Sequence, residues 1–166
     1  VTAARALETI ERNVKSQAQL IEDLLDISRI TTGKIRLNLQ PVDLESVIKA
    51  VTDALRPAAE AKDINVRMIL DTASPVYGDY ERLQQVMWNL LSNAIAYSPS
   101  GGHIRLSVTA TDGFIEFTVA DEGAGIPAAF LGSVFERFSS MPRGSGRGGV
   151  GLGLSIVKSF VALHGG

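Results

Sequence analysis

The chain has 166 residues with 16 basic and 18 acidic side chains, a net charge of −2, so it suits one domain plus an extra helix and excludes a basic nucleic-acid surface. Cysteine is absent, which excludes disulfides and thiolate metal sites and fits a reducing, cytoplasmic compartment. No apolar run approaches the ~20 residues of a membrane span, so we expect no membrane contact here, although a longer, membrane-anchored parent protein stays open.

An apolar stripe with alternating three- and four-residue spacing runs through residues 1 to about 30. Its members are Leu7, Ile10, Val14, Gln17, Ile21, Leu24 and Ser28. This spacing is typical of coiled-coil and bundle helices. No neighbouring segment could cover so long a stripe, so we predict a homodimer through this helix. A surface helix packed on its own domain is the alternative, and Gly33 predicts where the helix ends.

The rest of the chain alternates between strand and helix patterns. Strand-like alternation occurs over residues 34–42, 64–70, 76–77, 103–110 and 114–120, the last two as a hairpin. Helices are expected over 44–62 after an Asp43 cap, from an Asp79 cap to about 97, and from 152 onward. We therefore predict an α+β fold, with a mixed, mainly antiparallel sheet, helices on one face and one long bundle helix in front.

Two amides, Asn89 and Asn93, are four residues apart and share one face of a predicted helix. A carboxamide oxygen is a hard, neutral ligand suited to Mg²⁺, and its NH₂ group can donate to phosphate. Solvent-facing or capping amides are the alternative interpretation. The functional interpretation gains weight from two motifs further along the chain.

Both of these motifs are rich in glycine. The predicted strand 114–120 runs into Asp121, and Gly123 and Gly125 follow closely. The carboxylate can accept from the exocyclic amine of a nucleotide base while the glycines let the backbone approach its flat face. Residues 148–154 form a glycine-rich turn that opens a helix and offers free N–H groups to phosphates. Between them, residues 139–149 are too rich in glycine to pack a core; we predict a mobile lid, with a plain linker as the alternative.

These motifs, in this order, resemble the catalytic part of sensor histidine kinases, in the Bergerat-fold (GHKL) ATPase superfamily. Residues 89–99 resemble the N box, 121–125 the G1 box, 135–138 the F box and 149–154 the G2 box. The resemblance implies a two-layer α/β sandwich over residues 33–166. Residues 1–32 resemble the second helix of the dimerisation and phosphotransfer hairpin. The chain looks like a fragment without the family's C-terminal hairpin.

The resemblance also implies a binding site for ATP and Mg²⁺. Its nucleotide-binding residues would be Asn89, Asn93, Tyr97, Asp121, Gly123, Gly125, Ile126, Gly149, Gly151, Leu152, Gly153 and Leu154. Asn93 would hold the metal, with Asn89 as a second candidate ligand, and Tyr97 would lie against adenine. The lid would use Phe135, Phe138, Arg143 and Arg147.

The implied reaction is transfer of the ATP γ-phosphoryl to a histidine, and then to a response-regulator receiver domain. Relatives that hydrolyse ATP have a glutamate at the position of Asn89, so an amide favours transfer over hydrolysis. The chain departs from the family at Ala96, a usual lysine, and at Ser140, often arginine. It also lacks the family's motif that carries the acceptor histidine. Its two histidines, His103 and His164, are predicted to be structural, and no catalytic residue is assigned. The alternatives are a regulatory nucleotide-binding or dimerising module with weak or no transfer, and a protein serine kinase on the same fold.

Overall fold

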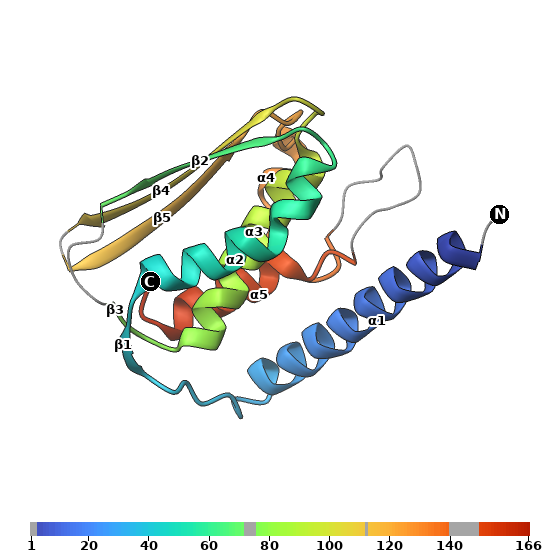
Figure 1. The fold of residues 1–166 in the computed structure, drawn as a ribbon. Coiled ribbons are helices and arrows are strands. Elements are labelled where there is room, and N and C mark those ends of the chain that lie inside the picture. The colour runs from blue at the N-terminus through green and yellow to red at the C-terminus, as the bar shows by residue number, and fades with distance from the viewer. Residues whose placement is uncertain (1–2, 72–75, 112, 140–149) are drawn as a thin grey trace.

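The computed structural model describes residues 3–71, 76–111, 113–139 and 150–166. Its elements in chain order are α1 (Ala3–Thr31), β1 (Gln40–Val42), α2 (Leu44–Glu60), β2 (Asn65–Leu70), β3 (Val76–Gly78), α3 (Tyr80–Tyr97), β4 (His103–Thr111), β5 (Phe114–Asp121), α4 (Ala128–Leu131) and α5 (Gly153–Leu163). A sheet and a layer of helices form the body, and α1 lies on the side of the helices away from the sheet (Figure 1).

The main sheet has the strand order β2-β4-β5. β2 pairs with β4 in parallel, with Asn65 opposite His103, and β4 pairs with β5 antiparallel, with Leu106 opposite Val119. β1 and β3 form a separate antiparallel pair. The predicted mixed sheet and its hairpin are thus confirmed.

One predicted strand is wrong over most of its length. Residues 34–39 belong to no strand, and only Gln40–Val42 pairs, with Val76–Gly78. Ile35 packs instead against the cluster around α5, and the backbone N–H of Asn38 donates to Asp79 Oδ2 at 2.8 Å. The alternation in this segment therefore reflects packing of an extended linker, not sheet pairing.

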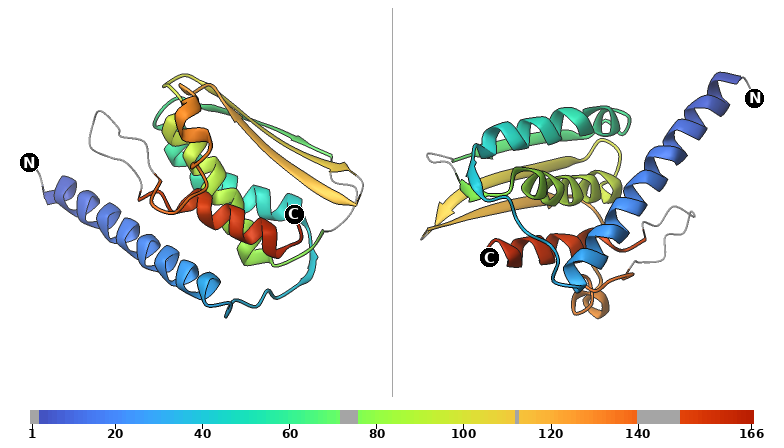
Figure 2. Two further views of the ribbon diagram at one scale, coloured as in Figure 1. Left: turned by 180° about the vertical axis from the view of Figure 1, so that it is seen from behind. Right: turned by 90° about the horizontal axis from the view of Figure 1, so that it is seen from below.

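Helices α2, α3 and α5 lie on one face of the sheet, as Figures 1 and 2 show. Asp43 caps α2 by accepting from the backbone N–H of Glu45 at 3.1 Å, and the inward residues of α2 are buried. Alternate residues of β4 and every third or fourth residue of α2 and α3 meet in one core, as hydrophobic periodicity predicts. The core shared by α2, α3 and β4 includes Val47, Ile48, Val51, Leu55, Leu91, Ile104, Leu106 and Val108.

His164 has the structural role that the sequence predicts. Its Nε2 accepts the backbone N–H of Asp79 at 3.0 Å, which leaves Nδ1 as the nitrogen that donates to Phe160 O at 2.7 Å. The end of α5 is thereby joined to the N-cap of α3. His103 opens β4, and its N–H donates to Glu122 and lowers the pKa of that carboxyl.

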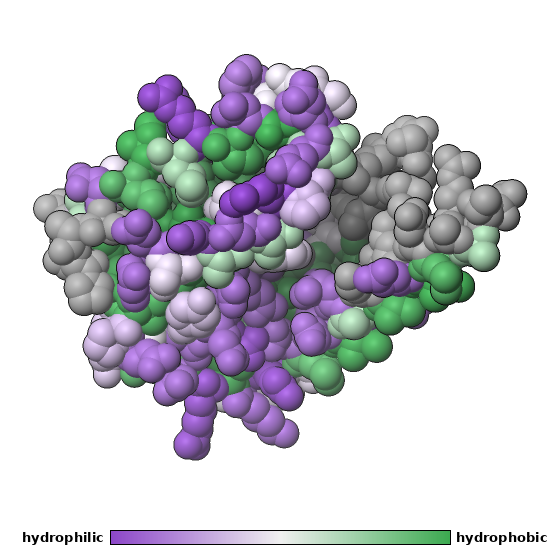
Figure 3. Space-filling model, in the orientation of Figure 1, coloured by the Kyte–Doolittle hydropathy of each residue, from purple (hydrophilic) through white to green (hydrophobic). Residues whose placement is uncertain are grey.

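Helix α1 has two different faces. The predicted apolar stripe is exposed, and its members Leu7, Ile10, Val14, Ile21 and Leu24 have 49–65% of their surface accessible. Hydrophobic residues accordingly line α1 in Figure 3. The other face carries Asp23 and Asp26, which are buried against the body. Within the described part of the chain, no helix is long and apolar enough to cross a membrane.

Candidate nucleotide site

A cavity of about 400 Å³ lies between α3, the segment leading into α5, the region around α4, and α1. Its volume and its mixture of apolar walls with a few polar groups are typical of small-molecule sites. Most of the residues predicted to bind nucleotide meet here. The lining residues are Leu20, Asp23, Asn89, Ser92, Asn93, Ala96, Tyr97, Ile126, Phe130, Val134, Ser139, Val150, Gly151, Leu152, Gly153 and Leu154.

The two amides line the cavity from successive turns of α3. The opposite face of α3 places Leu91, Ala94 and Ile95 in the core, which fixes the direction of the amides. Asn89 Nδ2 is buried and has no hydrogen-bond partner among the described residues. A buried donor without a partner costs about 1–3 kcal/mol. An anionic ligand such as a phosphate would supply the missing acceptor, so the residues present fit a nucleotide.

Glycines form the wall opposite the amides. Gly151 has φ +75°, and a Cβ there would lie 2.6 Å from Ser139 O. A Cβ at Gly153 would lie 3.1 Å from Asn89 Oδ1. A larger residue at position 153 would push against Asn89, and one at position 151 against Ser139. Helix α5 begins at Gly153, and its N-cap Leu152 provides no side-chain cap, so N–H groups and the positive end of the helix dipole face this region.

The loop after β5 lies against the last turn of α3. Asp121 Oδ1 accepts from the N–H of Gly123 at 2.7 Å, and a Cβ at Gly123 would lie 2.8 Å from Tyr97 O. Gly125 has φ +71°, a conformation that favours glycine. Tyr97 and Ile126 line the cavity, whereas Asp121 and these two glycines lie outside its lining. The loop thus borders the site through its contact with α3.

The predicted lid residues are only partly placed. Phe135 and Phe138 are exposed and outside the cavity lining, and Phe138 has the strained φ of +61°. The other predicted residues of this region, Gly149, Arg143, Arg147 and Ser140, lie outside the described residues.

Sequence reasoning missed two apolar lining residues, Phe130 in the short α4 and Val134 just after it. They are four positions apart, and that spacing was their only signal. Leu20 and Asp23 of α1 also reach the cavity, which the sequence did not predict. Asp23 lies on another face of α1 than the apolar stripe, so the stripe gives no indication that this residue reaches the cavity.

The carboxyl of Asp23 is perturbed by its position against the body. Burial raises its pKa, and the nearby charge of Asp26 acts in the same direction. A hydrogen bond from Gln19 Nε2 at 2.9 Å opposes this by lowering the pKa. The net effect is a raised pKa for a carboxyl on the wall of the cavity.

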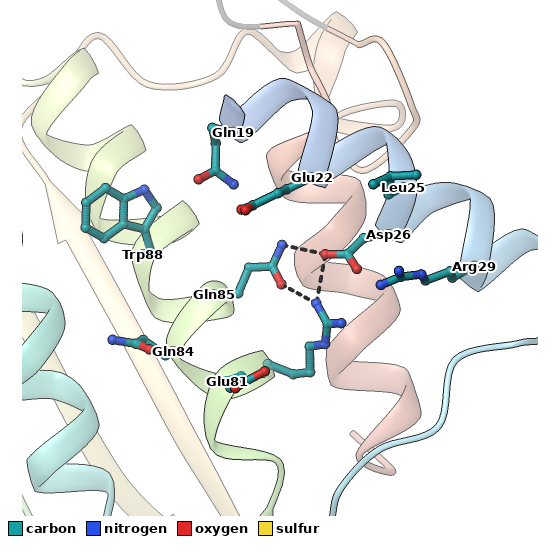
Figure 4. A pocket seen from close by; sticks show the side chains of 10 residues that line it. Gln19, Glu22, Leu25, Asp26, Arg29, Glu81, Gln84, Gln85 and Trp88 are labelled. Atoms are coloured by element: carbon teal, nitrogen blue, oxygen red, sulfur yellow. Dashed lines mark hydrogen bonds and ion pairs between the residues drawn. The ribbon is translucent and has the colours of Figure 1, made fainter. Parts of the chain in front are cut away.

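A second cavity, of about 490 Å³, separates α1 from α3 and is shown in Figure 4. At its wall Arg82 Nη1 donates to Asp26 Oδ2 at 2.8 Å and to Gln85 Oε1 at 2.9 Å. Gln85 Nε2 donates to the same carboxylate oxygen. The guanidinium also lies 4.9 Å from the centre of the Phe160 ring. This network fixes α1 on α3 and α5 and so holds Asp23 at the nucleotide cavity.

Residues 78–166, just over half of the chain, match the family described as histidine kinase-, DNA gyrase B- and HSP90-like ATPases. The chain belongs to this family. Its α/β fold and motif order define the catalytic ATP-binding domain found in sensor histidine kinases.

Named relatives agree with this assignment. The chain is 37% identical to hybrid signal transduction histidine kinase D of Dictyostelium discoideum, over 98% of this chain and 13% of that protein. Its fold matches Acinetobacter baumannii histidine kinase AdeS with a TM-score of 0.80 and 26% identity, over 98% of this chain and 75% of that one. Full-length ShkA in complex with AMPPNP matches with a TM-score of 0.78 and 30% identity, over 98% of this chain and 34% of that one. The chain therefore spans only a small part of its relative in Dictyostelium.

Proposed function

We propose that this chain binds ATP with Mg²⁺ and transfers the γ-phosphoryl group to a histidine. The observation that carries the proposal is the cavity in which Asn89 and Asn93 face the glycines of residues 151–153, with Asn89 Nδ2 lacking an acceptor among the described residues. ATP-binding function is shared across the matched family. The metal, the acceptor and the role of each residue are our inference.

Each wall has a distinct role in this proposal. Bound ATP supplies the phosphoryl group, and Mg²⁺ neutralises charge on the triphosphate. Asn93 holds the metal through its amide oxygen, Asn89 donates its Nδ2–H to a phosphate oxygen, and the N–H groups of residues 151–153 surround the phosphates. On the base side, Tyr97 packs against adenine and the carboxylate of Asp121 accepts a hydrogen bond from its amino group.

The chemistry of Asn89 supports transfer to nitrogen rather than hydrolysis. Attack by water needs a general base to remove a proton, and a neutral amide cannot act as one. A neutral imidazole already has a lone pair and needs no such base. His103 binds Glu122, and His164 is fully engaged by Asp79 and Phe160. We therefore place the acceptor histidine on a segment outside this chain or on a partner subunit.

The exposed stripe of α1 supports a homodimer as the assembly. Five large apolar side chains spaced for a helical bundle lie open to solvent there. A response-regulator receiver domain would take the phosphoryl group next, as the relatives' two-component class suggests. With ATP as donor, we place the reaction in the cytoplasm.

Ala96 favours a second candidate, a nucleotide-binding regulatory module with weak or no transfer. Its methyl group lines the cavity where a lysine would bring positive charge toward phosphate. A charge-assisted hydrogen bond contributes about 1.5–3 kcal/mol, so the substitution weakens nucleotide or transition-state binding. The intact amide pair favours the kinase.

An assay of phosphoryl transfer to an added acceptor distinguishes the histidine kinase from the regulatory module. The chain is incubated with γ-labelled ATP, Mg²⁺ and a separately made helical hairpin that carries an acceptor histidine. The kinase predicts acid-labile, base-stable label on the hairpin, lost with Asn93→Ala. Nucleotide binding measured by calorimetry without any transfer would support the regulatory module instead. Acid-stable label on a hydroxyl would indicate a serine kinase.

A further inference from the structure

The ammonium group of Lys62 lies at the C-terminal end of α3. Its Nζ donates to the carbonyl oxygens of Ile95 at 2.7 Å, Ala96 at 3.1 Å and Ser98 at 2.7 Å. An ammonium has three N–H donors, so these carbonyls use all of them. Lys62 comes from the turn between α2 and β2, far from α3 in sequence.

Helix α3 needs such a partner at this end. The last carbonyls of a helix have no intrahelical donor, and the helix dipole makes them negative. The last turn of α3 contains no basic residue, and its C-cap Ser98 is extended, at φ −65° and ψ 146°. Glycine in a left-handed conformation, the common cap, is therefore absent from this helix end. A cation from another element takes that role, and bonds to a charged donor are about twice as strong as neutral ones.

The backbone holds Lys62 in place for this contact. Its carbonyl accepts the N–H of Gly101 at 2.9 Å, and its own N–H donates to Ala59 O at 3.1 Å. The next residue, Asp63, has φ +54°, which is uncommon outside glycine. A tight turn fixed on both sides thus presents the side chain of Lys62 to α3.

The capped turn is also the base-side wall of the cavity. Tyr97 lines the cavity from this turn. Tyr97 O lies 2.8 Å from the position of a Cβ on Gly123, so the loop after β5 rests on the same turn. If the last turn of α3 frayed, Tyr97 and that loop would move together. Asn89 and Asn93, further from the helix end, would stay in place.

We infer that Lys62 is a positioning residue for the nucleotide site. It lies outside the cavity lining but fixes the last turn of α3, so that Tyr97 and the loop at residues 121–125 form a ready-made binding surface for the base. This inference rests on the proposed base-side role of Tyr97. It predicts that Lys62 and Tyr97 act on affinity as one unit.

A double-mutant cycle on ATP affinity tests the inference. Lys62→Met is expected to weaken ATP binding about tenfold, a ~1.4 kcal/mol change, when measured by calorimetry. Tyr97→Ala should weaken it at least as much, and the double variant should bind no more weakly than Tyr97→Ala alone. Independent sites would instead give additive losses. Lys62→Arg, which keeps several donors, should recover most of the affinity.

Arg56→Met serves as the matched control. It removes one positive charge from α2, where Arg56 is exposed and pairs with Asp53, and it should leave ATP affinity unchanged. If Lys62→Met fails to fold, as judged by thermal unfolding, Lys62→Gln, which retains an amide donor, replaces it in the cycle. Additive losses, or unchanged affinity in the Lys62 variants, would overturn the inference. Absence of ATP binding by the parent chain would overturn the proposed function itself.

Discussion

Asp26 of α1 and Arg82 of α3 form the ion pair that joins the N-terminal helix to the catalytic body. Asp26 is 4% exposed, and the Arg82 guanidinium is shared between this carboxylate, Gln85 and the face of Phe160. The pair is separated from the nucleotide cavity by less than one turn of α1, because Asp23 lines that cavity. The docking of α1 and the state of the site are therefore physically linked.

Asp26→Ala is expected to release α1 from the body. Losing one partner of a buried pair leaves the other charge desolvated and costs about 3–5 kcal/mol in fully buried cases; partial exposure of Arg82 lowers the cost to about 1–3 kcal/mol. Hydrogen exchange over residues 19–30 should accelerate, and the fluorescence of Trp88, which lines the second cavity between α1 and α3, should change. Glu22→Gln, on the same helix, is the control, and equal exchange in the two variants would refute the link.

The fold could be predicted where local pattern and tertiary partner agree. The Asp43 cap, the buried face of α2 and the hairpin of β4 and β5 all follow from periodicity and turn chemistry. The segment 34–39 could not, because its alternation is the same in a strand and in a packed linker. Only a pairing strand distinguishes the two, and β3 offers just three residues, so only Gln40–Val42 becomes a strand.

The site was predictable from motifs on α3 and α5, and less so elsewhere. Asn89, Asn93 and Gly151 meet as expected. Asp23 was missed because the apolar stripe dominates the sequence of α1, and a stripe says nothing about what its opposite face touches. Two lining residues in and just after α4 were missed because they belong to an almost irregular segment. Contacts between distant elements, not local pattern, bring these three to the cavity.

Asp23→Asn is expected to stabilise the docked α1 at neutral pH. Burial raises the pKa of Asp23 above its ordinary 3.8, so the docked state binds a proton more tightly than the free helix. The contribution of Asp23 to docking is therefore fully present below pH 3.8 and is lost as pH rises through the raised pKa. The variant removes this loss, and its melting temperature above that window should exceed the parent's by about 2–4 °C.

The same substitution should also strengthen ATP binding at neutral pH. A carboxylate on the cavity wall repels a triphosphate, and removing it should raise affinity about three- to tenfold. Glu60→Gln, at the exposed end of α2, controls for net charge. The stability prediction for Asp23→Asn has its own test. If the parent and this variant have the same melting temperature at every pH from acid to neutral, the assigned role of Asp23 is contradicted.

Asn89→Leu is expected to make the fold more stable and the site inactive. The change removes the buried Nδ2 that has no partner among the described residues and replaces it with an apolar group of similar shape. The free energy of unfolding should rise by about 1–3 kcal/mol, while ATP affinity falls below detection by calorimetry.

Ser98→Ala is the matched control for Asn89→Leu. Ser98 Oγ is also buried without a partner in the described part of the chain, but Ser98 lies outside the cavity lining. The control should stabilise the fold without loss of ATP binding. If Asn89→Leu instead destabilised the fold, the Nδ2 of Asn89 would not be an unpaired buried donor that is available to a ligand.

Gly151→Ala is expected to abolish tight ATP binding through the backbone. Gly151 has φ +75°, which costs a residue with a Cβ about 1–2 kcal/mol, and its added methyl would lie 2.6 Å from Ser139 O. The neighbouring backbone must shift, which displaces the N–H groups that face Asn89.

Gly113→Ala isolates the conformational cost, because Gly113 has φ +85° with open space around it and lies in the distant hairpin turn. Both variants should lose stability in thermal unfolding, Gly151→Ala more than Gly113→Ala because of its added clash, but only Gly151→Ala should lose more than about tenfold in ATP affinity. Equal affinities in the two variants would show that the close approach of Gly151 to Ser139 does not shape the site.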